Sequence, residues 1–160
     1  FNQTRGLGPV RYAQLQAVRE ICRRSDFISL KKELSLTSAQ DTCLFLKRSL
    51  RDKKNETVVA LFLDNQNRVI TYEELFQGTI NAAHIHTRPV IARILALNAA
   101  AVILAHNHPS GIAEASEQDK QMTVHLQEAL RLIDTRLLDH LIIGDNEVYS
   151  IISEMKWVCH

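Results

Sequence analysis

The sequence predicts an α/β protein in which buried strands alternate with amphipathic helices. Residues 57–63 and 101–104 are runs of apolar and β-branched side chains, which are typical of buried strands. In residues 89–100 and 116–132, apolar side chains recur instead at helical spacing. The alternation of the two patterns indicates a sheet that packs against helices.

The first part of the chain is expected to form a small helical segment, residues 1–36, that precedes a main domain, residues 37–160. Pro9 favours a helix start because its fixed φ suits the first helical turn. Leu15 and Val18 follow at helical spacing. The elements predicted here are a helix over residues 10–24, a connector over residues 26–36 and, after a capping box at residues 37–41, a helix that ends near residue 50.

The main domain is expected to open with a β-hairpin. Residues 64–67 have the polar composition of a turn, so the strand before them should return as a second strand. The predicted elements are, in order, strands over residues 57–63 and 68–71, an extended piece near residues 76–85, a helix over residues 89–100, a central strand from residue 101, a helix over residues 116–132, a strand over residues 137–144 and a short edge strand over residues 148–151.

Two histidines at the end of the central strand predict a metal site. His106 and His108 are two residues apart, so in an extended chain both imidazoles project from the same side. Proline, serine and glycine at residues 109–111 then end the strand in a turn. Ser116 has the position of a helix N-cap, which puts Asp119 in the first helical turn, facing the same site. Three ligands leave a tetrahedral zinc with one open position, as in catalytic sites.

The same stretch carries a family resemblance. The sequence His-Asn-His-Pro-Ser-Gly at residues 106–111, with Ser116 and Asp119 after it, is similar to the His-x-His-Pro and Ser-x-x-Asp signature of JAMM/MPN metalloproteases. It is closer still to the RadC family. Other parts of the chain that resemble the RadC pattern are Gly78 and Thr79, Arg88, residues 98–100, and Asp139 with His140.

The RadC resemblance implies a fold and an activity. The fold would be of the MPN or JAB1 type, a mixed β-sheet flanked by helices that is also similar to cytidine deaminases. His106, His108 and Asp119 would hold one Zn²⁺ per chain. The reaction would be hydrolysis of an amide or isopeptide bond in a peptide or protein substrate.

Two residues receive catalytic roles from this resemblance. JAMM enzymes carry a glutamate at the start of a buried strand upstream of the histidines, and Glu56 has this position. Glu73 and Glu74 are the alternatives for the general base that takes a proton from water. Ser116 would donate its hydroxyl to the oxyanion that forms at the carbonyl, or would serve only as the helix cap, since the two roles compete for one hydroxyl.

The basic start of the chain suggests an alternative function, that of a DNA-associated protein whose metal site is structural or vestigial. Residues 1–24 contain five arginines and one glutamate, a net charge of +4, in a chain of formal net charge +1. Gly6, Gly8 and Arg11 resemble part of a helix-hairpin-helix motif, in which backbone N–H groups and a basic side chain contact phosphate. An ordinary helix start accounts for the same residues. Any contact with DNA would be weak and independent of sequence.

Composition bounds the class of protein. The sequence has no apolar run of the roughly 20 residues that a membrane helix needs, and no signal-peptide pattern, so we expect a cytoplasmic protein. Cys22, Cys43 and Cys159 form no close pair and are expected to be reduced. A zinc deaminase is disfavoured because its His-x-Glu and Pro-Cys-x-x-Cys signatures are absent from the sequence.

Overall fold

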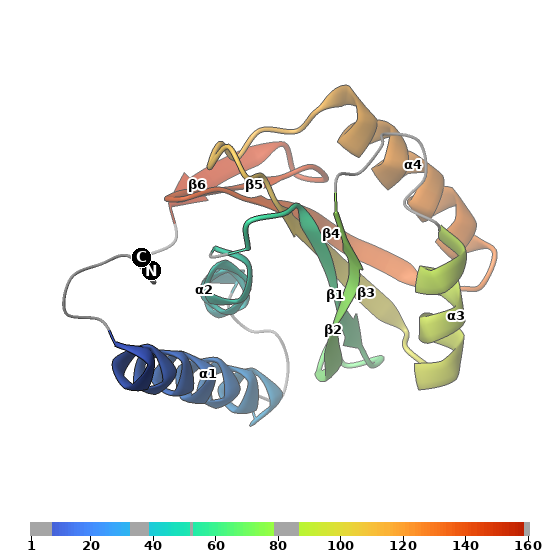
Figure 1. Ribbon diagram of the computed structural model, residues 1–160. Helices are drawn as coiled ribbons and strands as arrows, with labels where there is room; N and C mark the ends of the chain where they lie inside the picture. Colours follow the sequence, from blue (N-terminus) through green and yellow to red (C-terminus); the bar gives the residue numbers. More distant parts are fainter. Residues whose placement is uncertain (1–7, 33–38, 52, 79–86, 159–160) are drawn as a thin grey trace.

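A six-stranded mixed sheet with helices on both faces forms the centre of the protein (Figure 1). The computed structural model describes residues 8–32, 39–51, 53–78 and 87–158. Its elements are α1 (Pro9–Lys32), α2 (Ala39–Leu50), β1 (Thr57–Leu63), β2 (Val69–Gln77), α3 (Thr87–Leu97), β3 (Ala101–Asn107), α4 (Glu117–Arg131), β4 (Arg136–Ile143), β5 (Glu147–Ser150) and β6 (Met155–Val158). The predicted α/β class, with a mixed sheet flanked by helices, is confirmed.

The strand order is β2-β1-β3-β4-β5-β6, so β1 and β3 lie inside the sheet. β1 runs antiparallel to both β2 and β3, whereas β3 and β4 are parallel. Parallel neighbours need a crossover connection, which α4 supplies between β3 and β4. The N-terminal end of α4 therefore lies near the end of β3, which carries His106.

Two apolar clusters cover the two faces of the sheet. On one face, alternate residues of β1, including Val59 and Leu61, pack with Phe45 of α2. On the other face, Phe62 of β1 and Leu104 of β3 pack with residues of α3 and α4. Both strands are buried along their whole length, which explains why their sequences are almost continuously apolar.

Four expectations are wrong, and three of them concern elements. β2 continues to Gln77, beyond the expected end at residue 71. α1 continues to Lys32, so most of the predicted connector is helical. β5 is not an edge strand, because β6 pairs with it, and Glu154, with a φ of 53°, turns the chain back between them. Cys43 is disulfide-bonded rather than reduced, whereas Cys22 is a free, exposed thiol.

Several predictions concern residues that the structure does not describe. They are those for Gly6, the connector beyond residue 32, the start of the capping box at residues 37 and 38, the extended piece beyond residue 78, and Cys159. The domain boundary near residue 36 stays a prediction. Among the described helices, none has the length and apolarity that crossing a membrane would require.

Phe62 is fully buried, so substituting it tests how much core packing contributes to the stability of the protein. We expect Phe62→Ala to lower the free energy of unfolding by about 3–5 kcal/mol, because the substitution leaves a cavity between the sheet and its helices. Leu95→Ala is the control: this side chain is 62% exposed, so its loss should change stability by about 0.5 kcal/mol or less. Urea denaturation measures both, and equal losses would contradict the packing described here.

Candidate metal centre

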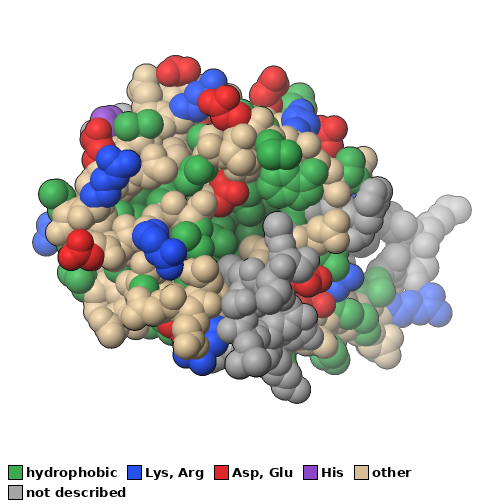
Figure 2. All heavy atoms as spheres, turned by 180° about the vertical axis from the view of Figure 1, so that it is seen from behind, with side chains coloured by type: hydrophobic (Ala, Val, Ile, Leu, Met, Phe, Trp, Pro, Cys, Tyr) green, Lys and Arg blue, Asp and Glu red, His purple; other side chains and the backbone are tan. Residues whose placement is uncertain are grey.

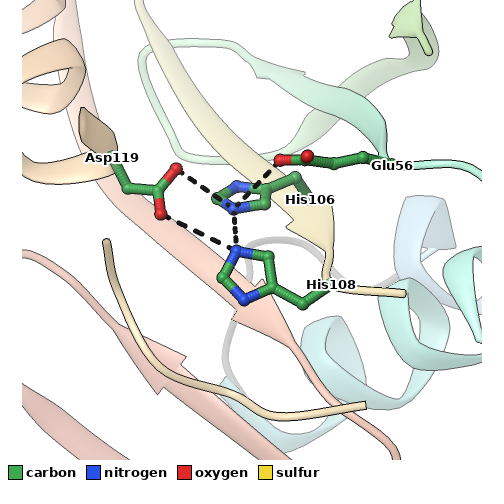
Figure 3. Close-up of side chains that lie close together, drawn as sticks. All are labelled: Glu56, His106, His108 and Asp119. Carbon is green, nitrogen blue, oxygen red and sulfur yellow. Dashed lines mark hydrogen bonds and ion pairs between the residues drawn. The ribbon is translucent and has the colours of Figure 1, made fainter. Parts of the chain in front are cut away.

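Four side chains with metal-ligating atoms converge beside the end of β3 (Figure 3). They are Glu56, His106, His108 and Asp119, and one ligand atom from each lies within 4.8 Å of all the others. His106 Nε2 is 3.0 Å from His108 Nε2 and 3.3 Å from Asp119 Oδ1. His108 Nε2 is 3.7 Å from Asp119 Oδ2. The predicted ligands are thus brought together, and Glu56 with them.

The pairing of β1 with β3 explains why Glu56 reaches the histidines. Val58 lies opposite His106 in the antiparallel register. Glu56 is two residues before Val58, so it projects from the same face of the sheet. Its Oε1 lies 3.9 Å from His106 Nε2, although the two residues are 50 positions apart in sequence.

Asn107 holds the segment that carries Glu56. The backbone N–H of Thr57 donates to Asn107 Oδ1 at 2.8 Å, and Asn107 Nδ2 donates to the carbonyls of Lys53 and Asn55 at 3.2 and 3.3 Å. Both neighbours of Glu56 are therefore tied to the residue between the two histidines. This role of Asn107 was not predicted, although the period of two that turns the histidines to one side turns this residue to the other.

The loop after β3 orients His108. Gly111 has a φ of 77°, and a Cβ there would lie 2.5 Å from Asp145 Oδ2, so glycine permits both the turn and its close packing on the β4–β5 connection. The loop then presents the carbonyl of Ile112 to His108 Nδ1 at 3.1 Å. A carbonyl only accepts, so Nδ1 carries the proton and His108 Nε2 is left with its lone pair toward the site.

The first turn of α4 orients Asp119. Ser116 is the N-cap, and the predicted cap is confirmed: the Asp119 N–H donates to Ser116 Oγ at 3.2 Å. In return, Ser116 N–H and Oγ–H donate to Asp119 Oδ2 at 2.8 and 2.6 Å, while Oδ1 faces His106. The Ser116 hydroxyl is thus engaged with Asp119, and its role at an oxyanion stays a prediction.

Two further buried side chains adjoin the group. His140 Nε2 lies 2.9 Å from His106 Nδ1, and His140 Nδ1 lies 2.7 Å from Thr123 Oγ1. Neither residue was predicted to belong to the site. A signal was available for Thr123, which is four residues after Asp119 and so lies on the same face of α4.

The charges of the group suit a cation. Burial lowers the pKa of His106 to about 4, so this ring is neutral near pH 7. Burial raises the pKa of Glu56, and the carboxylate of Asp119 raises the pKa of His108. Burial opposes ionisation of Asp119, but hydrogen bonds and charge from His108, His106 and Ser116 prevail and lower its pKa. With both carboxylates ionised, the group is therefore negative whether or not His108 is protonated.

The donor set fits a zinc ion. Ligand atoms held roughly 2.0–2.2 Å from a tetrahedral ion are separated by about 3.3–3.6 Å. His106 Nε2 lies 3.0 Å from His108 Nε2 and 3.3 Å from Asp119 Oδ1, and His108 Nε2 lies 3.7 Å from the other Asp119 oxygen, Oδ2, so small shifts would complete the set. Two imidazole nitrogens and one carboxylate oxygen also match the ligand types of catalytic zinc sites.

Other candidate residues lie outside this group. Glu73 and Glu74, in β2, form ion pairs with Arg93 and Lys53. Gly8 and Arg11 are exposed at the start of α1, which packs on the opposite face of the sheet from α4 (Figure 1).

The arginines of α1 give little added support to a contact with DNA, because some of them are paired with a carboxylate. Glu20 makes ion pairs with Arg23 and Arg24, two of the basic residues of α1. Figure 2 shows acidic and basic side chains interspersed over the described part of the face that it views. The DNA contact stays a prediction.

Comparison with known proteins gives a family match. A family model described as RadC-like JAB domain matches residues 36–157. A UPF0758 protein of Legionella pneumophila (strain Paris) is 63% identical over 160 residues, which are all of this chain and 70% of the relative. A UPF0758 protein of Thioalkalivibrio sulfidiphilus is 54% identical over 148 residues, 92% of this chain and 66% of the relative. A UPF0758 protein of Vibrio vulnificus (strain YJ016) is 50% identical over 158 residues, which are 99% of this chain and 70% of the relative.

The ligand assignment predicts a metal content. We expect the wild-type protein to bind about one zinc ion per chain and His106→Ala, His108→Ala and Asp119→Ala to lose it, because each removes one of three ligands. His125→Ala, at an exposed histidine of α4, is the matched control and should keep the metal. Elemental analysis after gel filtration measures the content, and equal zinc in all five proteins would refute the assignment.

The pKa of His108 predicts how zinc affinity depends on pH. Zinc displaces the proton from this ring, and the neighbouring Asp119 carboxylate raises its pKa above the usual 6.5. Affinity should therefore be constant above the raised pKa and fall about tenfold per pH unit below it, since one proton competes. Titration against a competing chelator measures this, and an affinity unchanged well below pH 6.5 would contradict it.

Proposed function

Because the chain belongs to the RadC-like JAB domain family, we propose that it is a zinc-dependent hydrolase that cleaves an amide bond, of peptide or isopeptide type, in a peptide or protein substrate. The observation that carries the proposal is the convergence of two imidazoles and two carboxylates within 4.8 Å. His106, His108 and Asp119 would hold the ion, which when bound supplies Lewis-acid activation of water and of the substrate carbonyl.

Glu56 is the general base of this proposal. Its carboxylate takes a proton from water at Oε1 and returns that proton to the leaving nitrogen. Two observations support the role: burial raises the pKa of Glu56 toward the range of a useful base, and its oxygen lies farther from His106 Nε2, at 3.9 Å, than that of Asp119, at 3.3 Å. That distance also exceeds the roughly 3.3–3.6 Å between two ligands of one tetrahedral ion, as suits a carboxylate that does not itself bind the ion.

Ser116 and Asp119 have linked roles. Ser116 holds Oδ2 of Asp119 through two hydrogen bonds, which leaves Oδ1 for the metal. Donation by Ser116 to a substrate oxyanion would require its hydroxyl to leave Asp119, while the backbone N–H of Ser116 continues to hold the carboxylate.

The variant Glu56→Gln distinguishes an enzyme from a protein that only binds zinc. The amide has nearly the same shape as the carboxylate, so the variant should keep its fold and its zinc but lose hydrolysis by on the order of 10²-fold or more. The assay screens zinc-loaded wild type against peptide and isopeptide libraries and then compares the variants.

The matched controls are Glu73→Gln and Glu74→Gln, whose carboxylates pair with Arg93 and Lys53 outside the group. They should retain hydrolysis. If one of them lost activity while Glu56→Gln kept it, the base would be reassigned. A wild type with bound zinc and no turnover of any substrate would count against the enzymatic proposal.

A further inference from the structure

A line of hydrogen bonds joins α4 to the ligand His106 through two side chains outside the ligand group. Thr123 Oγ1 lies 2.7 Å from the backbone carbonyl of Asp119 and 2.7 Å from His140 Nδ1. His140 Nε2 lies 2.9 Å from His106 Nδ1. His140 is fully buried and Thr123 is 3% exposed, so water does not replace these contacts.

The direction of each bond follows from the first one. The Asp119 carbonyl can only accept, so Thr123 donates its single hydroxyl hydrogen to it. The Thr123 oxygen must then accept from His140 Nδ1–H, which leaves Nε2 of a neutral His140 ring without a proton. His140 Nε2 therefore accepts from His106 Nδ1–H.

We propose that Thr123 and His140 are positioning residues that hold His106 in the tautomer whose Nε2 lone pair faces the ligand group. The inference rests on the proposed function in one respect, the identity of the cation as zinc. The ligand Asp119 has two parts in this arrangement, because its carboxylate faces the site while its backbone carbonyl anchors the line of hydrogen bonds that sets His106.

The tautomer matters because His108 is set in the same way. Its Nδ1–H is directed to the carbonyl of Ile112, so the neutral rings of His106 and His108 both present an unprotonated Nε2. These two nitrogens are 3.0 Å apart, a distance at which two lone pairs repel unless a cation or a proton lies between them. The surrounding hydrogen bonds thereby prepare a position for a positive charge.

Loss of the Thr123 hydroxyl would release this arrangement. With valine in its place, His140 Nδ1–H has no acceptor, and the proton is better placed on Nε2, where it can donate to His106 Nδ1. The His106 proton would then move to Nε2, the nitrogen that faces the ligand group. A proton at that position competes directly with a metal ion.

The first test reads the tautomers without any metal. Two-dimensional ¹⁵N–¹H spectra of the histidine rings distinguish Nδ1–H from Nε2–H by the shifts of the two nitrogens. In zinc-free wild type, at a pH where His108 is neutral, we expect Nδ1–H on both His106 and His140. An Nε2–H tautomer of His140 would overturn the inference, and this result needs no variant to fold.

The second test measures zinc affinity by competition with a chelator. Thr123→Val should weaken binding by roughly 10–100-fold, the usual effect of removing a partner of a ligating histidine. Thr123→Ser restores the hydroxyl and should bind nearly as wild type does. Thr135→Val is the matched control, because Thr135 is also buried and its Oγ1 also donates to a backbone carbonyl, that of Ile133. Among the described residues, no hydrogen bond joins its side chain to a histidine.

Together the variants separate positioning from loss of structure. If Thr123→Val and Thr135→Val bound zinc equally well and the His106 ring kept its tautomer in both, Thr123 would have no positioning role. Thermal unfolding of both variants shows whether stability differs. Failure of the proposed function is a distinct result: a wild type that takes up no zinc contradicts that function, while the ring tautomers of the metal-free protein still support or overturn the inference.

Discussion

The alternation of side chains at the end of β3 is the constraint on which the site depends. β3 lies between β1 and β4 and is buried along its whole length, so its direction and register are fixed by both neighbours. At the end of the strand, successive side chains point to opposite faces, so His106 and His108 lie on one face and Asn107 lies on the other. One short stretch therefore supplies two proposed ligands and the amide that holds the Glu56 segment in place. A slip of one residue would exchange these roles.

Burial of polar groups imposes a second constraint, because each buried donor or acceptor without a partner costs about 1–3 kcal/mol. His106 and His140 are both fully buried, and their ring nitrogens are accounted for by each other, by Thr123 and by the ligand group. The bonds of this network run in one direction, since it ends on a backbone carbonyl that can only accept. The geometry of α4 thus decides the proton positions of a ring on β3.

The sequence predicted those parts of the site that depend on local spacing. The histidine pair, the turn after it and the cap of α4 all lie within residues 106–119, where strand and helix periods suffice to place side chains. Glu56 is different, because it meets His106 only through the register of β1 against β3, and its assignment needed a family resemblance. His140 is likewise brought to His106 by the pairing of β3 with β4.

The fold shows the same division between local and long-range information. Apolar periodicity identified the strands of the sheet from β1 to β5 and the helices that cover them. It missed β6, a short strand with exposed residues that exists because β5 offers it an edge to pair with. It also ended α1 too early, because the part of that helix that includes Phe27 is stabilised by packing on the α2 face of the sheet, which local propensity does not report.

The core and the ligand group are separate in this protein, and that separation allows the site to be held in an unfavourable state. The apolar clusters on the two faces of the sheet contain none of the proposed ligands, so we expect the fold to survive the loss of a metal. It can therefore hold two imidazole lone pairs 3.0 Å apart, an arrangement that costs free energy in the metal-free protein. A cation between the two nitrogens would relieve that repulsion, so we expect the relief to contribute to affinity for the ion.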